Sequence, residues 1–210
     1  MLVAISQDNG NLGVKGYVDF LENNYFNYFK KFGFNLIPIP NGSDLNFYFD
    51  NLSIEAVILT GGTDIGENLL RDETEKNLLD FALRKRTPLL GICRGLQFIN
   101  HYFGGSLIKG LDERSHVNLN HNIILRGEFN EFFEGNMSFV NSFHRQGVSQ
   151  ESLSSELGSF AKTEDGIIEG LYHPNYPLAG IQWHPERKSP DEKLNEKILI
   201  AFSNKQLYWR

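Results

Sequence analysis

The sequence predicts a single α/β domain over residues 1–210, with a mostly parallel central sheet and helices on both faces. Strand signals and helix signals alternate along the chain, a pattern typical of parallel sheets. Of the 210 residues, 40% are hydrophobic, which is enough for one well-buried domain but too little chain for two complete ones. We find no internal repeat, low-complexity tract or linker that would divide this domain.

Three strands and two helices are expected in the first part of the chain. Short apolar runs predict the strands, at residues 2–6, 35–39 and 55–60. Apolar side chains recur at helical spacing from Tyr17 to Phe32, which predicts a helix with one face in the core, and Gly33 can end it. The segment Leu69–Arg86 predicts a second helix, because its start is acidic and its end is basic, as the helix dipole favours.

The rest of the chain predicts a strand at 88–92, a helix from Gly95 to about Phe103, and a second group of strands. Residues 112–136 are rich in Asn and are expected to form loops, followed by strands near 137–141, 158–163, 167–173 and 178–183. For the last helix, Ser189 is the expected N-cap residue, with Pro190 and Glu192 in the first turn.

Composition argues against several classes of protein. The net charge is −6 and the isoelectric point is near 5.5, whereas nucleic-acid-binding proteins usually carry a basic face. No apolar run approaches the length that spans a bilayer, so we expect no membrane partner. The single cysteine excludes an internal disulfide, and with no recognisable secretory segment in this sequence we expect a cytoplasmic protein.

Cys93 is the first candidate catalytic residue. It stands between Gly91 and Gly95, where the apolar strand 88–92 should turn sharply into a helix. The G-x-C-x-G pattern is typical of a nucleophile elbow, in which small neighbours let the backbone push a nucleophile out at the carboxyl edge of a sheet. The helix N-terminus would help the thiol to ionise. The alternative is a small buried hydrophobic residue, but a core cysteine needs no flanking glycines.

His184 and Glu186 are the candidate base and its orienting partner. In an extended segment, residues two apart project from the same face, and Pro185 between them biases His184 away from helix. A carboxylate beside an imidazole fixes its tautomer and stabilises the imidazolium. The alternative is an ordinary polar histidine, which the strand, proline and glutamate context makes less fitting.

Two other segments are candidates for binding. The Gly61-Gly62 turn ends a strand, so its amides and the amide of Arg94 could form an oxyanion hole at the same sheet edge. The stretch Asn141–Gln146 follows a strand and offers polar groups to a ligand. A plain turn and a plain polar loop are the respective alternatives.

The sequence predicts no cofactor and no metal site. His116 and His121 lack a regular metal-ligand spacing, and no second cysteine is available to complete a site. The oligomeric state is left open, a homodimer being one alternative.

Together these motifs resemble the class I glutamine amidotransferase superfamily, and more closely its free-standing γ-glutamyl hydrolase branch. The resemblance implies the flavodoxin-like sheet of that superfamily and covers most of the chain. It rests on segments that occur in this order: Gly61-Gly62-x-Asp64, Arg71-Asp72-x-x-Glu75, Gly91-Ile92-Cys93-Arg94-Gly95-x-Gln97, Asn100 with Gly104-Gly105, Asn141-Ser142-x-His144-x-Gln146, Asp165-Gly166-x-x-Glu169 and Gln182-Trp183-His184-Pro185-Glu186.

The resemblance implies a catalytic triad of Cys93, His184 and Glu186, and an oxyanion hole formed by the amides of Gly62 and Arg94. The residues it implies for substrate binding are Gly61, Gln97, Asn141, Ser142, Phe143, His144 and Arg145. The chain departs from the family pattern at Arg145, where a second histidine or a small residue is expected. A guanidinium there could pair with a diphosphate through two parallel hydrogen bonds.

The implied activity is hydrolysis of a γ-glutamyl amide or phosphoramidate through a γ-glutamyl thioester, with a small molecule as substrate and glutamate as product. Chain length, the Asn, Phe and Lys bias and Arg145 are similar to hydrolases of γ-glutamyl-CDP-amidate in capsule biosynthesis, which release cytidine diphosphoramidate. A γ-glutamyl amine such as γ-glutamyl-γ-aminobutyrate is the alternative substrate. Two rival classes are a glutaminase subunit that passes ammonia to a synthase and a catalytically silent module on the same fold.

Overall fold

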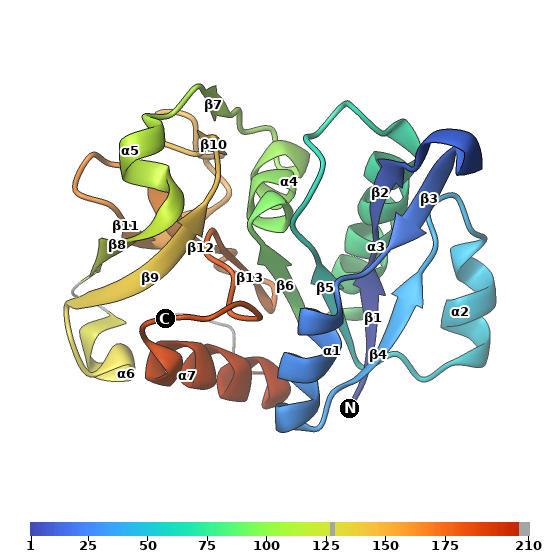
Figure 1. The fold of residues 1–210 in the computed structure, drawn as a ribbon. Coiled ribbons are helices and arrows are strands. Elements are labelled where there is room, and N and C mark those ends of the chain that lie inside the picture. Colours follow the sequence, from blue (N-terminus) through green and yellow to red (C-terminus); the bar gives the residue numbers. More distant parts are fainter. Residues whose placement is uncertain (127–128, 206–210) are drawn as a thin grey trace.

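A nine-stranded sheet runs through the middle of the molecule (Figure 1). The computed structural model describes residues 1–126 and 129–205. The strands of the sheet are β1 (Leu2–Ser6), β4 (Asn35–Ile39), β5 (Ala56–Leu59), β6 (Leu89–Ile92), β8 (Val117–Leu125), β9 (Met137–Phe143), β11 (Gly158–Lys162), β12 (Ile168–Tyr172) and β13 (Leu178–Ile181). Their spatial order is β4-β1-β5-β6-β13-β12-β11-β8-β9.

The sheet has a parallel part and an antiparallel part. The neighbours from β4 to β13 are parallel, and β12, β11, β8 and β9 extend the sheet with antiparallel pairs. In the parallel part Ile92 of β6 pairs with Ile181 of β13. This register brings the residues that follow the two strands to one edge of the sheet, and the parallel core confirms the predicted fold class.

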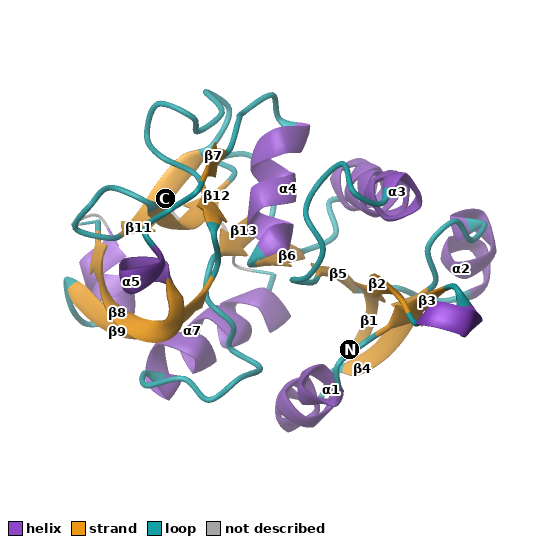
Figure 2. Ribbon diagram, turned by 45° about the horizontal axis from the view of Figure 1, so that its top comes forward, coloured by secondary structure: helices purple, strands orange, loops and turns teal. Residues whose placement is uncertain are grey.

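Helices cover both faces of the parallel part, with α2, α3 and α4 on one side and α1 and α7 on the other (Figure 2). Adjacent residues of β5 serve the two sides, because Ile58 packs in the cluster with α1 and α7 while Leu59 packs in the cluster with α3 and α4. The helices are α1 (Asn23–Phe29), α2 (Leu45–Asn51), α3 (Leu69–Lys85), α4 (Arg94–Tyr102), α5 (Glu113–His116), α6 (Asn130–Phe133) and α7 (Glu192–Ser203), with 3₁₀ turns η1 (Gly13–Lys15) and η2 (Lys30–Phe32).

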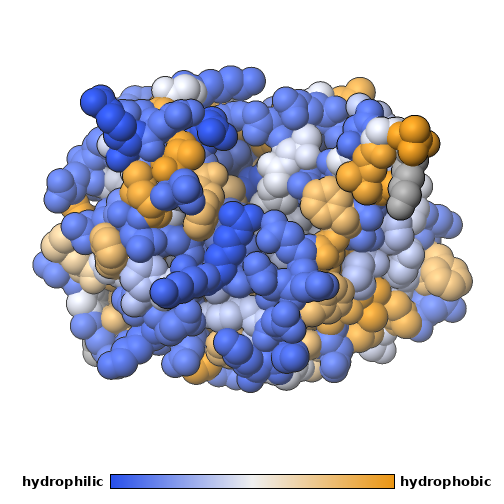
Figure 3. Space-filling view, viewed as in Figure 1, coloured by the Kyte–Doolittle hydropathy of each residue, from blue (hydrophilic) through white to orange (hydrophobic). Residues whose placement is uncertain are grey.

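The predicted helix from Tyr17 to Phe32 is wrong in its first part. Tyr17–Phe20 form strand β3, which pairs in a hairpin with β2 (Asp8–Asn11), and α1 begins only at Asn23. Tyr17 is 74% exposed, and hydrophobic side chains gather at the surface around this hairpin, at the upper right of Figure 3. The apolar residues of two short elements fell on one apparent helical period, because four residues of strand are too few to reveal their own alternation. Gly33 does end the segment with a left-handed φ of 72°.

The predicted loop region 112–136 also contains regular structure. Strand β8 occupies Val117–Leu125, and its asparagines at 118, 120 and 122 lie at exposed positions that alternate with half-buried ones. They are the solvent-facing residues of a strand rather than loop formers. The short strands β7 (Ile108–Lys109) and β10 (Gln146–Gly147) pair nearby, and α2 was also missed.

The last helix begins two residues later than predicted. Asp191, not Ser189, is the N-cap residue of α7, and its side chain accepts a hydrogen bond from the amide of Leu194 at 3.1 Å. A carboxylate at this position also interacts favourably with the helix dipole. Within the described residues, no helix combines the length and the apolar character that crossing a membrane requires.

Candidate active site

Cys93 occupies a strained turn between β6 and α4. Its φ is 54° and its ψ is −105°, a conformation that non-glycine residues rarely adopt. A Cβ on Gly91 would lie 2.5 Å from the backbone of Gly95, and a Cβ on Gly95 would lie 2.4 Å from the carbonyl oxygen of Leu59. Both flanking positions therefore require glycine, which is the backbone geometry that the G-x-C-x-G pattern predicts.

The structure brings together the three side chains that the sequence singled out. Nδ1 of His184 lies 2.6 Å from Oε1 of Glu186, and both side chains are buried. His184 also makes a hydrogen bond to Cys93. A Cβ on Gly61 would lie 2.7 Å from Cε1 of His184 and 3.5 Å from Cβ of Cys93, so the imidazole and the thiol lie against the same glycine. The imidazole thus lies between the thiol and the carboxylate.

The charges of this group favour an ionised thiol. Burial raises the pKa of the Cys93 thiol, but the charge and hydrogen bond of His184 outweigh that effect, so the pKa lies below its ordinary value. Burial lowers the pKa of His184, yet the charges of Cys93 and Glu186 raise it to about 10. At neutral pH the pair is therefore a thiolate and an imidazolium, the reactive form of a cysteine nucleophile.

Asn141 fixes the backbone of His184. Its Oδ1 accepts a hydrogen bond from the His184 amide at 2.9 Å, and its Nδ2 donates to the His184 carbonyl at 2.8 Å. The ring of Phe143 stands edge-on to the imidazole, with centroids 5.8 Å apart. Ser142 turns away, since its hydroxyl donates to the carbonyl of His116 at 2.6 Å. The substrate-binding role of this segment stays a prediction, and the bonds of Asn141 hold His184 in place.

Two buried glutamines connect the thiol to the rest of the site. Gln182 donates from Nε2 to Sγ of Cys93 at 3.4 Å. Gln97, predicted to bind substrate, donates to Oε1 of Gln182 at 3.3 Å and to the carbonyl of Gln146 at 3.0 Å. The sequence analysis assigned no role to Gln182, although it stands two residues before His184. Its amide helps to orient the sulfur.

Two predicted substrate-binding residues have bonds outside this group. Nε2 of His144 lies 3.2 Å from Oε1 of Glu169, and both side chains are buried. The side chain of Arg145 is 69% exposed and forms an ion pair with Glu113 at 2.8 Å. Arg145 would therefore have to exchange a surface carboxylate for a substrate phosphate.

The predicted oxyanion-hole residues lie in the turns after neighbouring parallel strands β5 and β6. Gly62 has a φ of 125°, and a Cβ there would lie 2.1 Å from the carboxylate of Asp8. Arg94 is the first residue of α4, where backbone amides lack an intrahelical partner. Its side chain is buried on ion pairs with Glu75 and Asp72, so only its backbone is available at the nucleophile.

A small pocket opens beside His184. Its volume is about 20 Å³, room for about one water molecule. Arg187 stands at its rim, with the guanidinium 3.0 Å from Oε1 of Glu22 and 4.8 Å above the ring of Phe143. The sequence analysis missed Arg187 and Glu22. The one available signal was the position of Arg187 directly after the His-Pro-Glu motif.

Known proteins share both the sequence motifs and the fold of this chain. The model of the family Peptidase C26 matches residues 2–186. Gamma-glutamyl-CDP-amidate hydrolase of Campylobacter jejuni is 35% identical over 161 residues, which cover 74% of each chain. The glutamine-hydrolyzing subunit of GMP synthase from Methanococcus aeolicus is 31% identical over 150 residues, covering 70% of this chain and 73% of the relative. A crystal structure of a glutamine amidotransferase from Thermotoga maritima superposes with a TM-score of 0.64 and 16% identity, covering 97% of this chain and 83% of that one, which shows the same fold.

Proposed function

Because this chain belongs to the Peptidase C26 family, we propose that it is a cysteine-dependent hydrolase that releases glutamate from a γ-glutamyl amide or phosphoramidate. The observation that carries the proposal is the contact of the His184 imidazole with both the Cys93 thiol and the Glu186 carboxylate. The strained turn at Cys93 supports it, since such strain is typical of functional sites.

In the first half of the proposed reaction, the Cys93 thiolate attacks the γ-carbonyl carbon of the substrate. The carbonyl π electrons move to oxygen, and the amides of Gly62 and Arg94 stabilise the resulting oxyanion. His184 then gives its proton to the departing nitrogen, the carbon–nitrogen bond breaks, and a γ-glutamyl thioester remains. Glu186 holds the imidazole in the orientation that this proton transfer requires.

The second half uses the same groups in reverse order. The neutral imidazole of His184 removes a proton from water, and the hydroxide attacks the thioester carbon. The carbon–sulfur bond then breaks, glutamate leaves, and the thiolate and imidazolium are restored. One imidazole thus serves as acid and then as base, and water is the only co-reactant.

For the leaving group we propose a nucleotide diphosphoramidate, with γ-glutamyl-CDP-amidate as the substrate. The Campylobacter relative supports this choice by the activity in its name. The charge of a diphosphate requires cationic side chains, and Arg187 at the rim of the pocket and the exposed Arg145 are the two to test. Because the pocket holds only about one water, the bridge between Glu22 and Arg187 must open when substrate enters.

The decisive experiment ranks glutamate release from γ-glutamyl-CDP-amidate, γ-glutamyl-γ-aminobutyrate and glutamine by kcat/KM. We expect the nucleotide amidate to lead, and Arg187→Ala to lower its kcat/KM while changing that of glutamine less. Cys93→Ala should bind substrate without turnover. Full turnover by Cys93→Ala would refute the mechanism, and a lead by the amine substrate would refute the choice of leaving group.

A glutaminase role within a synthase predicts a distinct outcome in the same assay. The relative in Methanococcus aeolicus is part of a synthase, which is why this test belongs here. A protein of that kind would hydrolyse glutamine rapidly only when a synthase is added, whereas we expect hydrolysis by the isolated chain. Failure of Cys93 to react with any γ-glutamyl electrophile would favour the catalytically silent module.

A further inference from the structure

A second cluster of buried ionisable side chains lies beyond the nucleophile. His116 ends α5, His144 follows β9, and Glu169 lies on β12, and each offers one ligand atom within 4.8 Å of the others. The three residues are 1%, 3% and 0% exposed. His121 on β8 joins them at the edge, with Nε2 3.5 Å from Oε2 of Glu169. Four segments that are distant in sequence therefore direct imidazole and carboxylate groups to one point.

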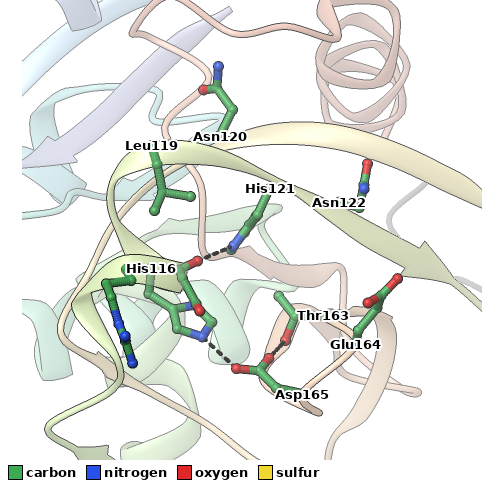
Figure 4. A pocket seen from close by; sticks show the side chains of 10 residues that line it. His116, Leu119, Asn120, His121, Asn122, Thr163, Glu164 and Asp165 are labelled. Atoms are coloured by element: carbon green, nitrogen blue, oxygen red, sulfur yellow. Dashed lines mark hydrogen bonds and ion pairs between the residues drawn. The ribbon is translucent and has the colours of Figure 1, made fainter.

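The outer nitrogen of each imidazole is held by an oxygen atom. His116 Nε2 pairs with Asp165 Oδ2 at 2.8 Å, His144 Nδ1 with the Gln146 carbonyl at 3.0 Å, and His121 Nδ1 with the Ser115 carbonyl at 3.0 Å. Figure 4 shows the His116 and His121 contacts as dashed lines. Each acceptor fixes the proton on the outer nitrogen, so the inner nitrogen presents a lone pair. Metal-bound histidines are almost always oriented in this way.

The inner atoms of the cluster lack hydrogen-bond partners among the described residues. They are Nδ1 of His116, Nε2 of His121, Nε2 of His144 and both carboxylate oxygens of Glu169. Buried polar atoms are nearly always satisfied, so a group of such atoms facing one another needs an explanation. Ion pairing of imidazolium groups with Glu169 accounts for the charge of the carboxylate, but it leaves Nδ1 of His116 without a partner.

We propose that His116, His144 and Glu169, with His121 as a fourth ligand, form a binding site for a divalent transition-metal ion, with Zn²⁺ as the best match. Three imidazoles and one carboxylate are ligands that zinc accepts in a four-coordinate site. The sequence prediction of no metal site rested on the spacing of His116 and His121 alone. The fold supplies the other two ligands from β12 and from the end of β9.

The cluster also has an entry path. A surface pocket of about 350 Å³ is lined by His116, His121 and Asp165, which Figure 4 shows from close by. An ion can therefore reach the inner nitrogens of these histidines from solvent. Its role would be to tie α5, β8, β9 and β12 together, and β9 also carries Asn141, which fixes the backbone of His184. The site thus braces the antiparallel part of the sheet next to the nucleophile.

Zinc binding to the full chain tests the proposal directly. The Cys93→Ser variant is the parent, because it removes the active-site thiol as a competing ligand. After treatment with a chelator, we expect calorimetric titration with ZnCl₂ to show one equivalent of tight binding, and CoCl₂ to give the visible absorption of a four-coordinate site. Zinc should also raise the Tm of this parent.

Two variants of the parent decide between a metal site and an ion-pair cluster. Asp165→Asn touches no metal but removes the group that orients His116, and such losses lower metal affinity about 10- to 100-fold. His116→Gln removes a ligand and should abolish both the one-equivalent binding and the rise in Tm. His101→Gln, an exposed histidine in α4, is the matched control and should bind zinc like the parent.

Circular dichroism shows whether each variant folds, and the exposed, peripheral position of Asp165 keeps Asp165→Asn usable if His116→Gln does not fold. The proposal is overturned if the parent shows no one-equivalent binding. It is equally overturned if folded Asp165→Asn and His116→Gln bind zinc as tightly as His101→Gln.

Discussion

Replacing Glu186 by Gln tests the role of the buried carboxylate in the active site. The substitution keeps the shape of the side chain but removes its charge, 2.6 Å from Nδ1 of His184 and out of contact with solvent. The imidazolium is then buried without its counter-charge, and the amide nitrogen can turn towards Nδ1 and favour the wrong tautomer.

The expected loss can be worked from the burial of this pair. Removing one partner of a buried ion pair costs about 3–5 kcal/mol. If that cost falls on the imidazolium form, a factor of ten per 1.36 kcal/mol gives a decrease in kcat/KM of roughly 200-fold to 5000-fold. The pKa of His184 should fall, because Glu186 is one of the charges that raise it.

Two assays measure these effects on the same samples. Glutamate release gives kcat/KM, and the rate of Cys93 alkylation by iodoacetamide as a function of pH gives the ionisation of the thiol. Glu196→Gln, an exposed residue of α7, is the matched control and should leave both unchanged. A folded Glu186→Gln variant with kcat/KM within about threefold of the unaltered enzyme would show that the carboxylate does not act through His184.

Three further predictions concern the elbow, the support of the histidine and the pH profile. Gly95→Ala should lower the free energy of unfolding in urea by about 1–3 kcal/mol or more, because its Cβ would lie 2.4 Å from the carbonyl oxygen of Leu59, whereas Gly135→Ala, with no atom closer than 3.9 Å, should change it little. Asn141→Ala removes both hydrogen bonds to the His184 backbone and should cost about 1–3 kcal/mol in urea unfolding and at least about tenfold in kcat; an unchanged kcat would contradict its positioning role. Alkylation of the nucleophilic thiol should stay fast at neutral pH and slow only when acid protonates it, while kcat/KM should fall as pH rises through about 10 and the imidazolium loses its proton; a thiol that ionises only above its ordinary pKa would contradict this assignment.

Local patterns predicted the parts of the site that lie within one segment. The strained turn at Cys93 follows from Gly91 and Gly95, because only glycine leaves room for the chain to double back there. The pairing of His184 with Glu186 follows from their spacing around a proline. Each of these features is dictated by residues within a few positions of one another, so the sequence contains the whole argument.

Features that need distant segments escaped the sequence analysis. The bonds of Asn141 to His184 depend on the end of β9 reaching the turn after β13, and the bridge of Arg187 to Glu22 crosses from the C-terminal to the N-terminal half. The meeting of His144 with Glu169 has the same origin. No periodicity or propensity encodes such contacts, and the family resemblance alone anticipated that Cys93 and His184 would meet.

The pairing of β6 with β13 has a consequence for synthesis of the chain. The nucleophile is made in the first half of translation, but the strand that carries the imidazole to it leaves the ribosome near the end. Contacts this distant in sequence form slowly, since a long loop must close before they contribute. The nascent polypeptide therefore holds an unassisted thiol until its last strands dock, and hydrolytic competence appears in one step at completion rather than growing with length.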